Sequence, residues 1–254
     1  MPESPLAPAS RQTTKPHERV FLSAAWRNLV MLNYEIDPSL LVPYLPVGLE
    51  IDSFQGATYV SLVGFQFLDT RLFGAMALPW HTNFDEINLR FYVRRRASDG
   101  FRRGVVFIKE IVPRLAIAWA ARQLYGENYS CHPMRHTVHR DESVIRAEYQ
   151  CKIGENRCRL HARASGEAAL PAENSLAEFI TEHYWGYTRR GPRSFEYHVA
   201  HPRWQVWDAE ESGCEGAAQK LYGASFAGVL RRPPVTAFIA EGSKVEVFNG
   251  RVIH

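Results

Sequence analysis

The alternation of apolar and polar side chains is clearest between residues 84 and 94. Its apolar residues are Phe84, Ile87, Leu89, Phe91 and Val93, and the polar set that recurs at every second position is Glu86, Asn88, Arg90 and Tyr92. Successive side chains of a β-strand point to opposite faces, so an extended chain places the polar set on a single face. The pattern predicts a strand over 84–94 whose polar face lines either a protein interior or the solvent.

The next apolar stretch, 104–112, is interrupted only by Lys109 and Glu110. Such a sequence is typical of a strand that is buried on both faces. Because Lys109 and Glu110 are adjacent in an extended chain, their side chains point to opposite faces. Only one of the two can therefore face an enclosed interior, and the sequence leaves open which one.

The rest of the pattern predicts many strands and few helices. Strands are expected at 20–36, 49–54, 57–68, 134–142, 144–153, 157–165, 194–199, 204–207 and 245–248. Helices are expected as a short turn after Asp37, at 115–125, from Asn174 or Ser175 to His183, and at 217–224. This order predicts a mainly β (α+β) fold, a closed or cone-like antiparallel β-barrel or double sheet with a few packed helices.

The chain divides into a tail and one domain. Residues 1–19 are rich in Pro and Ser and have no apolar stretch, so they are expected to form a flexible N-terminal tail. No repeat and no linker divides residues 20–254, which are expected to fold as a single domain. No apolar run approaches the roughly 18 residues that a membrane span needs. We expect a cytoplasmic protein with no membrane partner.

Composition narrows the classes of function. Charged residues make up 22% of the chain and the formal net charge is +3, with basic residues scattered along the sequence. The sequence contains no long basic stripe, so nucleic acid is not an expected partner. Only five of the 30 basic residues are lysines, which gives the position of each lysine added weight.

Cysteine and histidine spacings favour neither a disulfide framework nor a metal site. The four cysteines form no C-x-x-C pair, and Cys151 and Cys158 flank a predicted hairpin turn. Reduced thiols are therefore expected. The run from Cys131 to His139 matches no standard zinc spacing. Motifs for serine hydrolases, P-loop NTPases and dinucleotide oxidoreductases are absent from the sequence, and we expect no metal and no cofactor.

Two segments resemble the acetoacetate decarboxylase-like superfamily. Residues 33–52, NYEIDPSLLVPYLPVGLEID, are similar to its opening strand, D-x-x-x-L helix and P-x-x-L-E-x-D strand. Residues 121–129, ARQLYGENY, stand where that superfamily has G-R-E-x-x-G-x-P-K. Further segments resemble the uncharacterised YqjF-like branch: FDEINLRFYV, GVVFIKEIVPR, RQLYGENY, EHYWGYTR, HPRW and AEGSKVEVFNG. Together they cover most of the chain from about residue 20.

The resemblance implies a cone-like antiparallel β-barrel around a solvent-accessible cavity, with helices outside. Decarboxylases of the superfamily use the last lysine of the second segment to form a Schiff base with a β-keto acid. The matching residue here is Tyr129, followed by Ser130, and neither can form an imine. Members often assemble through sheet edges and helices, so a homo-oligomer is an open expectation.

Lys109 is the candidate amine. If it faces the interior, desolvation would lower its pKa by up to about 3–5 units, and a neutral amine could attack a carbonyl. Alternatively Lys109 stays charged and pairs with a carboxylate such as Glu86. The resemblance places Glu86 near a cavity glutamate of the decarboxylases, which nominates it as acid or base. Arg90 could hold a carboxylate through a bidentate pair, with Asn88 on the same face.

The other candidates come from the ends of elements. The resemblance implies that Tyr129 could donate a hydrogen bond to a ligand oxygen, while Arg122 anchors the loop that carries it. Glu110 is the candidate for the interior if Lys109 points away. His183 follows an apolar helix face and could reach the interior. Tyr129 could instead serve only packing, and His183 could be a structural histidine.

Three hypotheses of function follow. The first is an enzyme-like pocket, lyase-like but without the usual lysine, for a small carbonyl or carboxylate compound. In it, Lys109 and Glu86 are catalytic, while Arg90, Tyr129, Asn88, Glu110, Arg122 and His183 bind the ligand. The second is a non-catalytic protein that binds such a ligand in the same cavity. The third is an interior filled by its own side chains. The sequence does not decide whether the protein is an enzyme.

Overall fold

The computed structural model describes residues 19–73, 76–77, 82–113 and 128–253, and most of them form two β-sheets. The larger sheet contains β1 (Val20–Glu35), β2 (Glu50–Ile51), β3 (Tyr59–Leu72), β4 (Met76–Ala77), β5 (Phe84–Ala97), β6 (Gly100–Val112), β7 (Tyr129–Cys131), β11 (Trp185–Arg190), β12 (Arg193–Ala200), β13 (Val206–Asp208), β15 (Thr236–Phe248) and β16 (Arg251–Val252). The smaller sheet contains β8 (Met134–Arg140), β9 (Val144–Ile153), β10 (Asn156–Ser165) and β14 (Glu211–Gly216).

Short helices complete the described structure. They are the 3₁₀ turns η1 (Pro38–Leu40) and η2 (Val42–Tyr44) and the α-helices α2 (Leu176–Thr181) and α3 (Ala218–Leu230). Asp37 caps η1, with Pro38 at its first position, as the sequence predicts. Ser175 caps α2, so that predicted start is also confirmed, although the helix ends at Thr181 before reaching His183. The helix predicted at 115–125 lies outside the described residues.

Seven strands of the larger sheet close into a ring. Their order is β15, β1, β3, β5, β6, β11 and β12, and β12 pairs with β15 to complete the circle. The prediction of a mainly β fold with a closed sheet and a few packed helices is confirmed. One detail of that prediction is wrong, because β6 runs parallel to both β11 and β7 and the sheet is therefore mixed.

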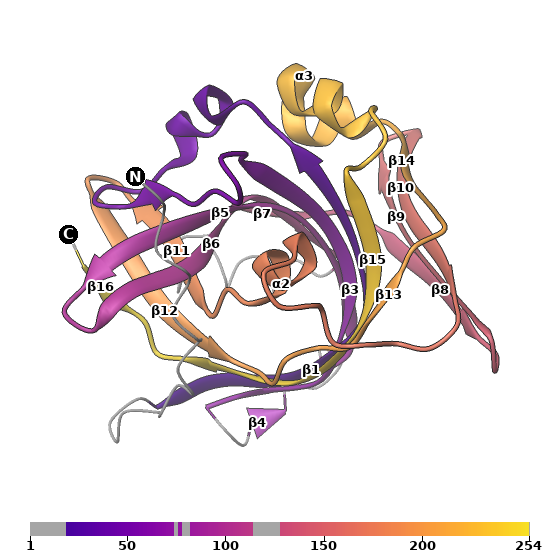
Figure 1. The fold of residues 1–254 in the computed structure, drawn as a ribbon, viewed down its shortest axis with the longest axis horizontal. Helices are drawn as coiled ribbons and strands as arrows, with labels where there is room; N and C mark the ends of the chain where they lie inside the picture. The colour runs from indigo at the N-terminus through magenta and orange to yellow at the C-terminus, as the bar shows by residue number, and fades with distance from the viewer. Residues whose placement is uncertain (1–18, 74–75, 78–81, 114–127, 254) are drawn as a thin grey trace.

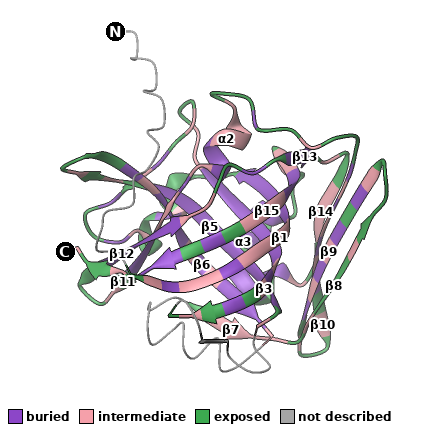
Figure 2. Ribbon diagram, turned by 90° about the horizontal axis from the view of Figure 1, so that it is seen from below, coloured by how far each residue is buried: buried purple, intermediate pink, exposed green. Residues whose placement is uncertain are grey.

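Each face of the ring is covered by different elements. On the outer face, Ile87 and Leu89 belong to a core shared with Tyr149 of β9 and Leu221 of α3. The inner face carries a second core to which α2 contributes Phe179. Figure 1 shows α2 within the ring, with the smaller sheet and α3 outside it. In Figure 2 the strands β5 and β6 are largely buried, as expected for strands covered on both faces.

A β-bulge in β6 decides which polar side chains enter the ring. Leu89 pairs with Lys109 and Arg90 pairs with Phe107, so Ile108 is an extra residue on β6. The bulge leaves Ile108 and Lys109 on the outer face, whereas Glu110 pairs with Asn88 and faces inward. Among the described residues, no helix is both long and apolar enough to span a membrane.

Candidate functional site in the ring interior

The polar row of β5 lies on the inner face of the ring. Glu86 and Asn88 are each 2% exposed, Arg90 is 9% exposed and Tyr92 is fully buried. A solvent-facing row is therefore inconsistent with the structure. The strand instead carries four polar side chains into the interior, where burial makes each unmet hydrogen bond costly.

Glu86 is held by two hydrogen bonds. The Asn88 side-chain amide donates to one carboxylate oxygen at 2.9 Å, and the Tyr129 hydroxyl donates to the other at 3.3 Å. Burial raises the pKa of Glu86 to about 7, although these hydrogen bonds and the charge of Arg90 act in the opposite direction. A carboxyl group with this pKa exchanges its proton near neutral pH, as general acid–base catalysis requires.

Tyr129 connects Glu86 to a second buried carboxyl group. It lies on β7 and pairs with Glu110 of β6, which is 2% exposed. Burial raises the pKa of Tyr129 well above its usual value, and the charges of Glu110 and Glu86 raise it further. Tyr129 therefore stays protonated and can serve as a hydrogen-bond donor between the two carboxyl groups.

Arg90 brings a positive charge into this interior. Its guanidinium lies 6.0 Å from the centre of the Tyr92 ring. Within the described part of the chain, no carboxylate forms an ion pair with Arg90, and its Nε–H finds no acceptor. Buried arginines are normally paired, so this one has the capacity to bind an anion.

His183 packs beside the same tyrosine. Its ring centre lies 4.8 Å from that of Tyr92 and 5.0 Å from that of Phe179. Burial lowers the pKa of His183 to about 4, so the imidazole is neutral at physiological pH. Its Nε2 lies 3.3 Å from the Asp52 carboxylate, while Nδ1 has no partner among the described residues. A neutral ring that donates from Nε2 presents Nδ1 as an acceptor.

Asp52 positions His183 and is itself positioned by Arg103. The Arg103 Nε–H donates to the Asp52 carboxylate at 2.7 Å. Burial opposes ionisation of Asp52, but the hydrogen bond and charge of His183 and those of Arg103 lower its pKa to about 2. The prediction missed this pair, although Asp52 ends the D-x-x-x-L to E-x-D segment that carries the resemblance.

A second chain of hydrogen bonds fixes Tyr92. Its hydroxyl lies 2.5 Å from the Ser61 hydroxyl, which donates to the Asn33 side chain at 2.6 Å. Asn33 then donates to Thr236 at 3.2 Å. This series of hydrogen bonds crosses β5, β3, β1 and β15, so the Tyr92 ring beside Arg90 is held by four strands of the ring.

Lys109 does not join this site. Its amine donates to the Leu221 backbone carbonyl of α3 at 3.0 Å, on the outer face of the ring. The hypothesis that adjacent strands direct the amine of Lys109 and the carboxylate of Glu86 into one hollow is therefore wrong, as is their ion pair. The bulge at Ile108 keeps Lys109 on the face of Leu89. Arg122, the remaining candidate, lies outside the described residues.

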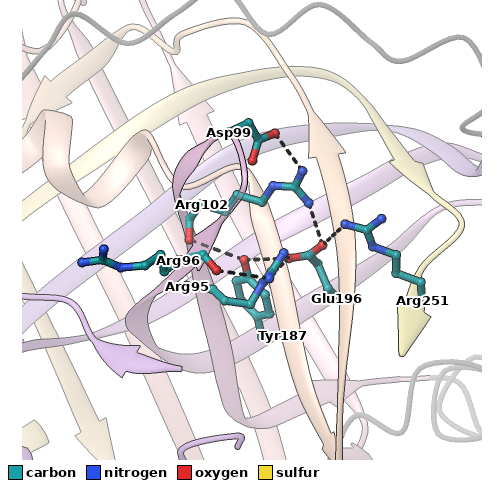
Figure 3. A network of polar contacts seen from close by, with 7 residues as sticks. All are labelled: Arg95, Arg96, Asp99, Arg102, Tyr187, Glu196 and Arg251. Atoms are coloured by element: carbon teal, nitrogen blue, oxygen red, sulfur yellow. Dashed lines mark hydrogen bonds and ion pairs between the residues drawn. The ribbon is translucent and has the colours of Figure 1, made fainter. Parts of the chain in front are cut away.

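Other polar features lie away from the inner face. A buried carboxylate, Glu196, forms ion pairs with arginines from several strands at one end of the ring, and Figure 3 shows this network. A surface groove of about 560 Å³ runs past Tyr34, Asp37 and Arg232. The predicted site residues do not line this groove, so we do not assign the candidate site to it.

Comparison with known proteins places the chain in a family. The family DUF2071, described as an uncharacterized conserved protein, matches residues 23–244. The chain belongs to the DUF2071 family. A relative, the uncharacterized protein YqjF of Bacillus subtilis, is 24% identical over 188 residues, which are 73% of this chain and 74% of that protein. The predicted YqjF-like branch is confirmed.

Solved structures extend the likeness of this DUF2071 chain at the level of fold. An acetoacetate decarboxylase-like enzyme from Sphingomonas wittichii has a TM-score of 0.67 at 13% identity, covering 98% of this chain and 97% of that one. Acetoacetate decarboxylase from Legionella pneumophila has a TM-score of 0.63 at 15% identity, covering 98% and 92%. The enduracididine biosynthesis enzyme MppR, solved with pyruvate, has a TM-score of 0.62 at 14% identity, covering 98% and 95%. The fold is acetoacetate decarboxylase-like.

Proposed function

We propose that the ring interior binds a small carbonyl or carboxylate compound and that Glu86 exchanges a proton with it. The observation that carries this proposal is the state of Arg90. A guanidinium that is 9% exposed and has no ion pair among the described residues is costly unless an anion joins it. A ligand carboxylate would provide that anion through two parallel N–H···O bonds.

Two hydrogen-bond acceptors near Arg90 that lack a donor indicate which further groups the ligand should carry. The side-chain amide oxygen of Asn88 and the Nδ1 atom of His183 have no hydrogen-bond partner in the described part of the chain. Asn88 and Arg90 share the inner face of β5, and His183 and Arg90 both lie against Tyr92. A carboxylate with a nearby hydroxyl would satisfy the arginine and donate to these acceptors.

Glu86, Tyr129 and Glu110 support a role in proton transfer. The Tyr129 hydroxyl has one proton, which it donates in a hydrogen bond to Glu86. Tyr129 also shares a hydrogen bond with Glu110. When both bonds form, the Tyr129 oxygen accepts one of them, so one of the two carboxyl groups must be its donor. Two buried carboxyl groups that share protons through a phenol are suited to accept and return a proton at carbon beside a carbonyl.

Imine chemistry is not part of the proposal. Among the lysines that the structure describes, Lys109 lies under α3, and Lys152, Lys220 and Lys244 are exposed. Pyruvate bound to MppR, a protein of the same fold, supports the choice of a 2-oxo acid as the first ligand to test. The reaction would then be lyase-like only if proton transfer or bond cleavage proceeds without a Schiff base.

Calorimetric titration with pyruvate, and then with a panel of 2-oxo and 2-hydroxy acids, tests the binding step. We expect Arg90→Gln to weaken binding at least about tenfold, because a charge-assisted bidentate pair contributes roughly 1.5–3 kcal/mol. Arg94→Gln is the matched control, since Arg94 pairs with Glu50 at the exposed edge. Equal affinity of Arg90→Gln and the unsubstituted protein would overturn the proposed site.

Proton NMR in D₂O tests the catalytic step. If the Glu86 carboxylate takes a proton from the carbon beside the ligand carbonyl, solvent deuterium replaces it when the proton is returned. Glu86→Gln should bind the ligand and lose this exchange. Binding without exchange or turnover by the unsubstituted protein would favour the alternative, a non-catalytic ligand-binding protein in which Arg90 and His183 serve recognition alone.

A further inference from the structure

Three cysteines from three strands of the smaller sheet meet beneath α3. Cys151 of β9 and Cys158 of β10 are direct cross-strand partners, which confirms that they lie opposite each other. Cys214 of β14 pairs with Leu160, two residues from Cys158, and is therefore its diagonal neighbour. The sulfur atoms of Cys158 and Cys214 are 3.9 Å apart. All three thiols are reduced in the structure.

We propose that Cys158 and Cys214 are an oxidation site that forms a reversible disulfide in the presence of a hydroperoxide. The two sulfur atoms need to approach by about 2 Å to reach bonding distance. Adjacent antiparallel strands already hold them on one face of the sheet. Cys151 and Cys158 are each 2% exposed or less, whereas Cys214 is half-buried.

The position of Cys214 gives an oxidant a route to the pair. Strand β14 lies at one edge of the smaller sheet, where its neighbour among the described strands is β10. Edge strands open locally more readily than central ones, which would expose Cys158. The thiols of Cys151 and Cys214 can donate hydrogen bonds to the Cys158 sulfur, and these bonds lower the pKa of Cys158.

The chemistry balances with the peroxide as the oxidant. The Cys158 sulfur attacks the outer oxygen of the peroxide, the O–O bond breaks, and the alkoxide leaves and takes a proton as an alcohol. The resulting Cys158 sulfenic acid is then attacked by the Cys214 sulfur, and water leaves as the S–S bond forms. Two thiols lose two electrons and two protons, and the peroxide is reduced to an alcohol and water.

The bond would stabilise the region where α3 begins. Strand β14 ends at Gly216, α3 starts at Ala218, and the Leu221 carbonyl of this helix accepts from Lys109. A disulfide between positions 158 and 214 closes a long loop in the unfolded chain. On the entropy model this raises the melting temperature by roughly 5–10 °C for a domain of this size.

Peroxide treatment followed by intact mass and peptide mapping tests the proposal. The folded protein should lose the mass of two hydrogen atoms, yield a peptide pair that joins Cys158 to Cys214, and melt at a higher temperature until a reductant is added. Cys158→Ser and Cys214→Ser should each abolish the linked pair. Cys131→Ser, on β7, and Cys151→Ser should each retain it.

Other outcomes would overturn it. These are a link between Cys151 and Cys158, a mixture of sulfenic and sulfinic acids without a disulfide, or no reaction in the folded protein while the urea-unfolded chain is oxidised. Melting curves of each variant under reducing conditions show whether it folds. Because Cys214 is half-buried, Cys214→Ser should disturb folding less than the substitution of the buried Cys158. Cys214→Ser therefore decides the test if Cys158→Ser does not fold.

Discussion

Arg90 carries a charge into the ring and forms no ion pair with any described carboxylate. Its backbone is fixed within β5, where Ser61 of β3 is its cross-strand partner. The residue therefore cannot turn to the surface without disturbing the ring. A buried charge kept at a cost to stability is typical of a binding site rather than of a structural core.

Arg90→Met should therefore increase stability while it abolishes ligand binding. Methionine keeps the apolar stem and removes a buried charge that has no ion pair among the described residues, so we expect the free energy of unfolding to rise by about 1–3 kcal/mol. Urea unfolding without ligand measures this change. Arg103→Met is the contrasting variant, since it removes the partner of Asp52 and should destabilise the protein. A loss of stability in Arg90→Met would show that the charge is structurally compensated.

The raised pKa of Glu86 predicts the direction in which the stability of the protein changes with pH. Its pKa is about 7 in the folded protein against an ordinary 4.5, so the folded state binds more protons than the unfolded state between these values. The contribution of Glu86 to the free energy of unfolding is fully present below about pH 4.5 and is lost as pH rises through 7. The total loss is about 3 kcal/mol, from roughly 2.5 pKa units at 1.36 kcal/mol each.

Glu86→Gln should remove this dependence. His183 acts in the opposite direction, because its lowered pKa of about 4 makes the folded state more stable as pH rises from about 4 to 6.5. The difference between the unfolding free energies of the unsubstituted protein and Glu86→Gln isolates Glu86, since His183 contributes to both. We expect this difference to change mainly between pH 4.5 and 7. A constant difference would mean that Glu86 titrates normally.

At the scale of elements, the alternation of residues predicted more of the site than any motif did. The period-two row in 84–94 correctly places four polar residues on one face, because β-strand geometry fixes that relation locally. The face that points inward depends on partners distant in sequence, such as α2. The bulge at Ile108 could not be predicted, since Ile108 is as apolar as its neighbours.

Strand ends and irregular strands were also poorly predicted. β11 (Trp185–Arg190) and β14 (Glu211–Gly216) were missed, because Gly186 and Gly213 weaken their apolar alternation. β15 was expected only over 245–248 but spans Thr236–Phe248, with Gly242 at a positive φ of 79°. Asp52 and Arg103 were missed for another reason, since their ion pair joins segments about fifty residues apart.

The bulge in β6 leads to a prediction about covalent chemistry. Lys109 lies on the outer face, so incubation with pyruvate and borohydride should fix no adduct on it, and Lys109→Met should bind ligand as the unsubstituted protein does. Methionine retains the stem that packs beneath α3. Peptide mass spectrometry after reduction measures the adduct. A reduced imine at Lys109 would contradict the placement of this side chain.

At the scale of the whole molecule, ring closure depends on two short seams. β6 and β11 are joined by only two residue pairs, Trp185 with Gly104 and Gly186 with Val105. β12 and β15 are likewise joined by two pairs. At Gly104 an added Cβ would lie 2.4 Å from the Trp185 carbonyl oxygen, so only glycine allows this approach. The β11–β12 hairpin thus needs a second means of attachment.

The Glu196 network provides that attachment. Glu196 of β12 has a fully buried side chain that accepts from Arg95 of β5 at 2.7 Å and from Arg102 of β6 at 2.8 Å. Arg251 of β16 and the Tyr187 hydroxyl of β11 donate to the same carboxylate at 3.1 Å. Figure 3 shows these donors converging from separate strands. One buried charge therefore ties the hairpin to the β5–β6 side of the ring.

Glu196→Gln should open the ring at this seam. Glutamine cannot neutralise the guanidinium groups, and breaking a buried charge pair costs roughly 3–5 kcal/mol. Hydrogen exchange should show the amides of β11 and β12 losing protection before those of β3 and β5. Glu50→Gln, which breaks the exposed pair with Arg94, is the control and should change stability by less than about 0.5 kcal/mol. Uniform loss of protection across all strands would instead mean that the ring unfolds as one unit and that the network does not act as a local clasp.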